Sequence, residues 1–167
     1  MMNDMSAMKL HNTIYGTDFL NFPFNKRSWE VVLLPFGIWM TEENYSAIAS
    51  ASQYMGDEEY FIVDAEKTGL LPQAAILQWP YADLEKLEAK HQLGQVITHW
   101  FGRSASWGVA CHEDHFATIG GDPDFMDRFV MLRGGREALR STFLEYWPHV
   151  ILRNEDRKKT VLSFAGW

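Results

Sequence analysis

The stretch QVITHWFGRSASWGVACHEDHFATIGG at 95–121 decides the expected fold. Its apolar, β-branched and aromatic residues fall into three short runs, at 95–101, 107–112 and 115–120. Connections as short as those between the runs join antiparallel neighbours, because a parallel pair of strands needs a long crossover. The sequence therefore predicts a mainly antiparallel sheet that contains three consecutive strands.

Segments on both sides of this stretch extend the pattern to an α+β domain. Capping residues such as Thr41 and Asp122 mark helix starts, and glycines mark helix ends. Strands are predicted at 30–34, 59–66 and 74–79, helices from Thr41 to Gly56, at 82–94, from Asp122 to Gly134 and at 136–147, and a last strand pair around the polar turn at 154–159. We predict one domain at 29–167, with a mainly antiparallel sheet of about five to seven strands and three or four helices packed on it, after an irregular segment at 1–28.

Composition places the chain among ordinary globular proteins. It has 167 residues, of which 47% are hydrophobic and 22% charged, far from the balance of disordered chains. Cys111 is the only cysteine, so an intramolecular disulfide and a cysteine-based zinc cluster are excluded, and a reducing compartment is expected. The N-terminus has no signal-peptide core, and no apolar run reaches the ~20 residues of a membrane span. We expect a cytoplasmic protein with no membrane partner.

Acidic side chains are concentrated between Ser28 and Glu66, where the chain has no Lys or Arg. The segment has eight acids and a formal charge of −8, so the remainder of the chain, at −7 overall, is left at +1. Basic side chains outnumber acids between Arg128 and Lys159. The two segments either fold against each other or form solvated faces; alternatively, the acidic segment steers a basic partner. The candidate partner-binding residues are Glu42, Glu43, Asp57, Glu58, Glu59, Asp64 and Glu66.

The sequence CHEDH at 111–115 is a candidate for the tip of a hairpin. A turn at its centre pairs His112 with His115 and Cys111 with Phe116. The core face of this hairpin then comprises Trp107, Val109, Cys111 and Phe116. We therefore expect the cysteine to be a buried small hydrophobe rather than a nucleophile, and the histidines to leave by the other side or at the tip.

A metal site is the alternative interpretation of CHEDH. Opposed strand residues have β-carbons about 5 Å apart, so two histidines there can share a metal to which an acid adds an oxygen. The ligands would be His112, Asp114 and His115. However, the spacing matches neither HExxH nor the Cys and His patterns of zinc modules, and two of the ligands would lie on a turn. We favour a protein without a metal or other cofactor.

No nucleophile elbow, P-loop or dinucleotide fingerprint is present. The acidic balance also argues against nucleic-acid binding, which requires a basic groove. We therefore expect a non-enzymatic protein-binding domain whose partner is a protein with a basic surface, such as an inhibitor or immunity-type protein that neutralises a basic toxin or nuclease. The alternatives are a metal-assisted hydrolase that uses CHEDH, and an oligomeric structural or phage-associated protein.

Overall fold

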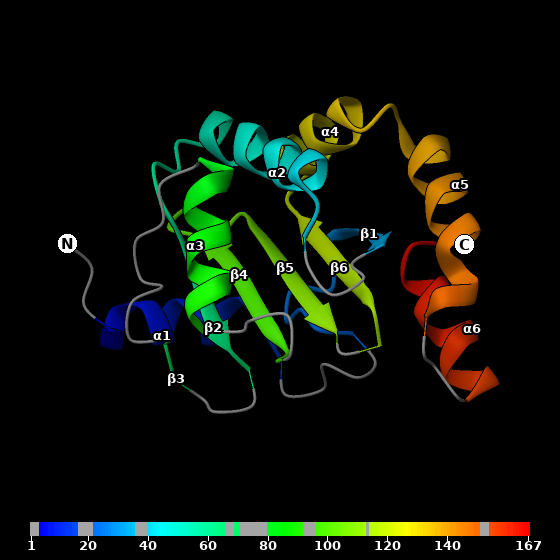
Figure 1. Ribbon diagram of the computed structural model, residues 1–167, viewed down its shortest axis with the longest axis horizontal. Helices are drawn as coiled ribbons and strands as arrows, with labels where there is room; N and C mark the ends of the chain where they lie inside the picture. Colours follow the sequence, from blue (N-terminus) through cyan, green and yellow to red (C-terminus); the bar gives the residue numbers. More distant parts are fainter. Residues whose placement is uncertain are drawn as a thin grey trace.

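The computed structural model describes residues 4–16, 22–35, 40–65, 69–70, 80–91, 96–112, 114–150 and 154–167. The strands are β1 Glu30–Pro35, β2 Tyr60–Asp64, β3 Gly69–Leu70, β4 Thr98–Gly102, β5 Trp107–His112 and β6 Phe116–Gly121. They form a single antiparallel sheet in the order β1-β6-β5-β4-β2-β3 (Figure 1). The predicted α+β class and the three consecutive antiparallel strands are thus confirmed.

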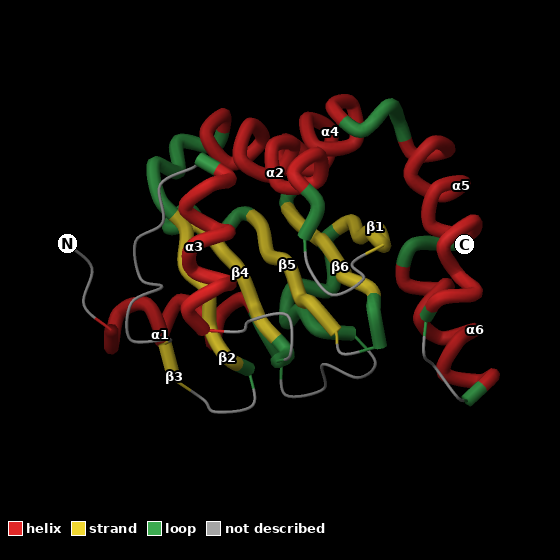
Figure 2. Tube along the Cα trace, in the orientation of Figure 1, coloured by secondary structure: helices red, strands yellow, loops and turns green. Residues whose placement is uncertain are grey.

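Helices cover both faces of this sheet, as Figure 2 shows. The helices are α1 Asp4–Ile14, α2 Glu42–Tyr54, α3 Tyr81–His91, α4 Pro123–Leu132, α5 Arg136–Tyr146 and α6 Glu155–Phe164, and a 3-10 turn, η2, spans Trp147–His149. Alternate residues of each strand point to opposite faces. Tyr60 and Ile62 of β2 therefore pack with α2, α3 and α4, whereas Phe61 and Val63 pack with α1.

Local signals explain where α2 and α4 begin. The Oγ1 of Thr41 accepts a hydrogen bond from the backbone N–H of Asn44, which caps α2 as predicted. Pro123 opens α4 at a position where its missing N–H has no intrahelical partner to lose. The side chain of Asp122 makes no cap; its carboxylate accepts a hydrogen bond from Nε1 of Trp29 at 2.8 Å instead.

The C-terminal helices lie beside the edge strand β1 (Figure 1). Leu139 of α5 belongs to the core cluster under α2 and α4. One turn later, Phe143 packs with Leu33 and Phe116, whose side chains point to the opposite face of the sheet. The helix α5 therefore crosses the outer side of β1 and contacts both faces.

Three elements differ from the sequence-based expectations. The segment expected to be irregular contains α1, and a β-bridge joins Tyr15 to Phe24. The polar run at 154–159 is not a turn between strands; Asn154 caps α6, which continues through the expected second strand. The described part of the chain consequently has more helices than predicted. The strand expected at 74–79 lies outside the described residues.

The hairpin between β5 and β6 is shifted by one residue from the expected register. His112 pairs with Phe116, and Cys111 pairs with Ala117. His115 has a φ of +68°, the left-handed conformation that closes a three-residue loop between the strands. Because a one-residue shift moves a side chain to the other face, Phe116 leaves the predicted core face.

No helix within the described ranges is long and apolar enough to cross a membrane.

Candidate functional site

The predicted partner-binding acids do not form one surface. Asp57 and Asp64 are buried, with 3% and 2% of their surface exposed, so an outside partner does not reach them in this structure. The Asp57 carboxylate accepts hydrogen bonds from the backbone N–H and Oγ of Ser104 and from Nε1 of Trp107, at 2.7–2.8 Å. It therefore fixes the turn between β4 and β5. Glu66 lies outside the described residues.

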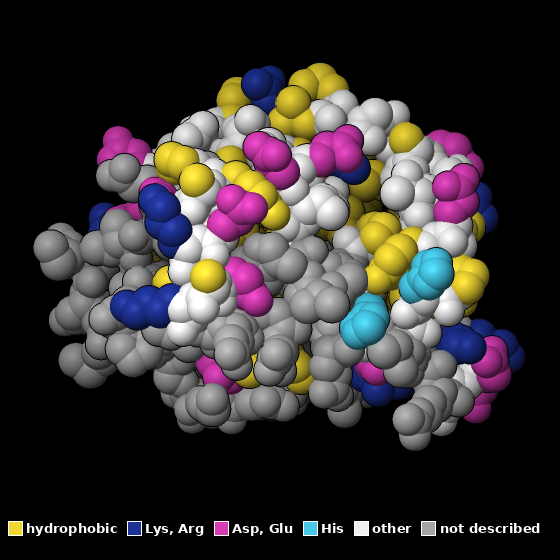
Figure 3. All heavy atoms as spheres, in the orientation of Figure 1, with side chains coloured by type: hydrophobic (Ala, Val, Ile, Leu, Met, Phe, Trp, Pro, Cys, Tyr) yellow, Lys and Arg dark blue, Asp and Glu magenta, His cyan; other side chains and the backbone are white. Residues whose placement is uncertain are grey.

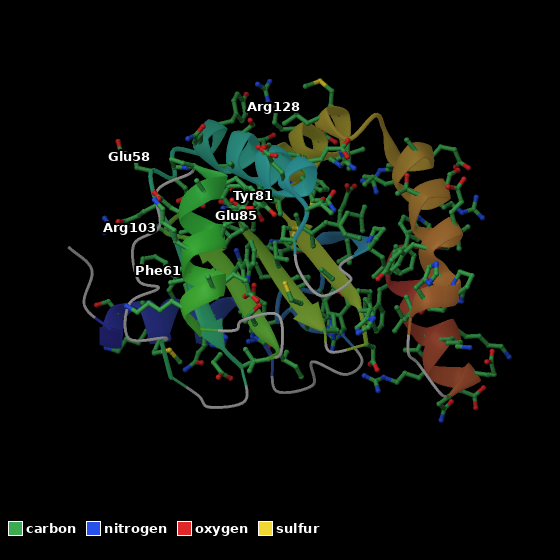
Figure 4. The ribbon with its side chains drawn as sticks, viewed as in Figure 1. Glu58, Phe61, Tyr81, Glu85, Arg103 and Arg128 are labelled. Carbon is green, nitrogen blue, oxygen red and sulfur yellow. The ribbon has the colours of Figure 1, made fainter. Side chains whose placement is uncertain are left out.

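Arginines neutralise several of the other acids. Glu43 pairs with Arg133, and Glu30 of the same acidic segment pairs with Arg136. These two ion pairs join the acidic segment to the basic segment of the C-terminal region, as one of the two sequence-based interpretations expected. Glu59 is paired with Arg103 at the other end of the molecule (Figure 4). The field of this segment is therefore weaker than its formal charge suggests.

Two of the predicted acids, Glu42 on α2 and Glu58 in the loop after α2, are exposed without an ion pair to a described residue, and α3 adds the exposed Glu85. Glu42 opens α2, and Glu85 lies one turn into α3; both are exposed, and neither forms an ion pair with any described residue. Figure 3 shows that acidic side chains gather over these two helices. We call the surface formed by Glu42, Tyr81, Asp83 and Glu85 the acidic face; within it, Asp83 is paired with Lys86 of the same helix at 3.0 Å. Its α3 members belong to a helix that the sequence predicted without assigning it a role in binding.

Tyr81 is the aromatic residue of the acidic face. Its side chain is partly buried and lies near Glu85 (Figure 4). Its hydroxyl donates a hydrogen bond to the carbonyl of Met40 at 2.9 Å. Burial raises the pKa of Tyr81, and the charges of Glu85 and Glu42 raise it further. The ring thus sits in a negative potential set by both helices.

The CHEDH histidines are not a directly opposed pair. The His112 ring is 8% exposed, hydrogen-bonded to Oγ1 of Thr118 at 3.2 Å and stacked on Phe116 with centroids 4.2 Å apart. Burial lowers its pKa to about 3, helped by the charge of Arg157. The carboxylate of Asp114 pairs with that same arginine at 3.0 Å. The described residues, which omit Glu113, contain no group of three His, Cys, Asp or Glu side chains arranged to hold a metal.

Cys111 is buried against the core under α2 and α4, as the sequence predicted. Burial raises the pKa of its thiol to about 12, although a hydrogen bond with Thr98 acts in the opposite direction. A thiol of this kind is protonated at neutral pH and is a poor nucleophile.

A pocket of about 380 Å³ opens between the start of α2, the end of β1 and α5. Its lining combines an aliphatic floor with polar walls: Leu34, Pro35, Thr41, Glu43, Asn44, Arg133, Leu139, Thr142, Glu145, Tyr146 and His149. We call it the α2–α5 pocket. Asn44 is only 4% exposed, yet its Oδ1 has no hydrogen-bond partner among the described residues. Buried polar atoms are normally paired, so this oxygen is an acceptor that no described residue satisfies.

A second buried polar cluster lies under α1, on the opposite face of the sheet. Tyr15 stacks on His99 with centroids 4.0 Å apart, and His11 stacks on both rings. The Tyr15 hydroxyl bonds to the carbonyls of Trp100 and Val109. Burial lowers the pKa of His99 well below its usual range. The sequence signalled none of the contacts between α1 and the sheet, because they join residues more than eighty positions apart.

Comparisons with protein-family models, with curated proteins and with solved structures give no match for this chain.

Proposed function

We propose that this protein is a non-enzymatic binding domain that engages a partner protein with a basic surface through the acidic face. The observation that carries the proposal is the placement of the partly exposed Tyr81 beside Glu85 (Figure 4), where the charges of both Glu85 on α3 and Glu42 on α2 act on it. Exposed carboxylates steer a basic partner and set the orientation in which it docks. An aromatic ring beside them supplies contact area that the charges lack.

The tyrosine suits an interface because its position is fixed in advance. Its hydroxyl is already bonded to the carbonyl of Met40, so binding costs little side-chain entropy. Tyr is also among the residues that most often carry the binding energy of protein interfaces. An inhibitor or immunity-type protein that neutralises a basic toxin or nuclease is the form of this function that a small acidic domain fits best.

The test compares two charge-reversed variants that change the net charge equally. Glu42→Lys/Glu85→Lys alters the acidic face, whereas Glu58→Lys/Glu137→Lys alters exposed acids elsewhere. Each protein and the wild type are used as bait in lysate of the native cell at low and high salt, and the retained proteins are quantified by mass spectrometry. Circular dichroism establishes that all three are folded.

We expect a stoichiometric partner that the wild type and the Glu58/Glu137 variant retain at low salt, that the Glu42/Glu85 variant loses, and that high salt releases. The proposal fails if the partner binds both variants equally, or if no protein is retained in stoichiometric amount by the wild type.

A further inference from the structure

We infer that the α2–α5 pocket receives the guanidinium group of an arginine side chain from the basic partner. This inference rests on the proposed function and adds to it the chemical group that the partner presents. The pocket combines a buried acceptor for which no described residue supplies a donor, a net negative charge and an aromatic wall.

Asn44 provides the first argument. It follows the capping residue of α2 by three positions, and its backbone N–H is held by Thr41 while its Oδ1 has no partner in the described part of the chain. Leaving such an oxygen buried and unpaired destabilises a folded protein. A ligand that carries only donors recovers this energy, and every polar atom of a guanidinium is a donor.

The charges of the lining provide the second argument. Arg133 is already paired with Glu43, and its side chain is only 11% exposed; its Nε, like the Oδ1 of Asn44, has no hydrogen-bond partner among the described residues. Glu145 is exposed and, among the described residues, has no ion pair. Counting His149 as neutral, the two glutamates and one arginine leave the pocket at −1, which favours a cation over an anion.

The shape and chemistry of the walls provide the third argument. The floor is formed by Leu34 and Leu139, which suit the aliphatic stem of a long side chain. Tyr146 forms part of the wall, and its ring lies 5.4 Å from that of His149. A planar guanidinium stacks on aromatic rings and is less strongly hydrated than an ammonium, so arginine fits this lining better than lysine.

The experiment uses N-acetylarginine N-methylamide as the probe, titrated into the isotope-labelled full chain and followed by NMR. The matched probes are the lysine and citrulline analogues, the first with an ammonium and the second with no charge. The variants are Asn44→Leu and Glu145→Gln, and Glu137→Gln is the control on the same helix. A single side chain of this size is expected to bind with an affinity of about millimolar.

We expect saturable shifts with the arginine probe that are weaker by roughly tenfold or more with either matched probe. Asn44→Leu and Glu145→Gln should each weaken the arginine probe about tenfold, and Glu137→Gln should not. If Asn44→Leu does not fold, Glu145→Gln alone decides. The inference is overturned if the arginine probe does not saturate, if citrulline or lysine binds equally well, or if neither variant affects binding.

The result also separates this inference from the proposed function. Saturable binding of the probe without any retained partner supports the arginine site in the α2–α5 pocket and rules out the proposed function. A partner whose binding depends on Glu42 and Glu85, together with a probe that does not saturate, supports the proposed function and rules out the arginine site in the pocket.

Discussion

The Nε2 atom of His11 lies 3.0 Å from the Nδ1 atom of His99, so a hydrogen bond between two histidines joins α1 to the sheet. One nitrogen must donate and the other accept, which requires that at least one ring stays neutral. Burial lowers the pKa of both rings, and the charge of His11 lowers the pKa of His99 further. The lowered pKa of both rings therefore favours the neutral histidines that this hydrogen bond requires.

We predict that acid destabilises this protein from about pH 6.5 downward. A histidine whose folded pKa lies below its unfolded value near 6.5 binds more protons when unfolded, so stability is retained above that pH and lost below it. Buried His99 and His112 should each contribute a slope of up to about 1.4 kcal/mol per pH unit. Urea unfolding between pH 7.5 and 4.5 measures this slope.

Two substitutions identify the source of the slope. His112→Gln should reduce it, since its pKa of about 3 leaves the folded state unprotonated throughout the range. His99→Gln should also reduce it, because burial lowers the pKa of His99 well below its usual range. Equal slopes in the wild type and His112→Gln would contradict the assignment.

We predict that Asp57→Asn acts on stability rather than on partner affinity. Three donors converge on the Asp57 carboxylate, and an amide turns at least one N–H toward a donor. The expected loss in unfolding free energy is about 2–3 kcal/mol. Chemical denaturation measures it, with Glu58→Gln at the neighbouring exposed acid expected to stay within about 0.5 kcal/mol. Wild-type stability in Asp57→Asn would show that the carboxylate does not fix the turn.

We predict that His115→Gly preserves the hairpin. The residue has a φ of +68°, which glycine adopts without the steric cost that a β-carbon brings. Glycine should be neutral or stabilising by up to about 1 kcal/mol, whereas His115→Val should cost about 1–2 kcal/mol. Thermal unfolding distinguishes the two variants. A glycine variant less stable than the valine variant would exclude the left-handed conformation.

We predict that Asn154→Ala weakens α6. The Asn154 side chain accepts hydrogen bonds from the backbone N–H groups of Asp156 and Arg157 at 2.9 and 3.2 Å. Removing this cap should cost about 1 kcal/mol, and Asn154→Ser should cost little. Hydrogen exchange at 155–164 reports the effect locally. Faster exchange in the alanine variant is expected there; unchanged exchange would contradict the capping role.

Sequence reasoning predicted most of the elements whose ends are marked by local sequence signals. Thr41 and the glycine after α2 bracket that helix, and Pro123 marks the start of α4. These signals depend on residues adjacent in the chain, so they can be recognised without a structure. The burial of Cys111 followed from strand alternation in the same way.

The sequence-based predictions are wrong where contacts between distant parts of the chain determine the local structure. The hairpin register depended on the conformation of His115, and a left-handed histidine is not evident from its identity. The α6 helix begins in a run of polar residues that resembles a turn, and its helical state is stabilised by packing of Val161 against the α5 region. The pocket around Asn44 was inaccessible to sequence reasoning, because its walls come from separate parts of the chain.

The position of α5 across β1 has a consequence for the behaviour of this protein at high concentration. An edge strand with free N–H and C=O groups is a template on which a strand from another molecule can add. Leu139 and Phe143 hold the helix against both faces of the sheet at that edge. Fibril growth by strand addition at β1 would therefore require α5 to detach first, so the packing of this helix protects the protein against aggregation.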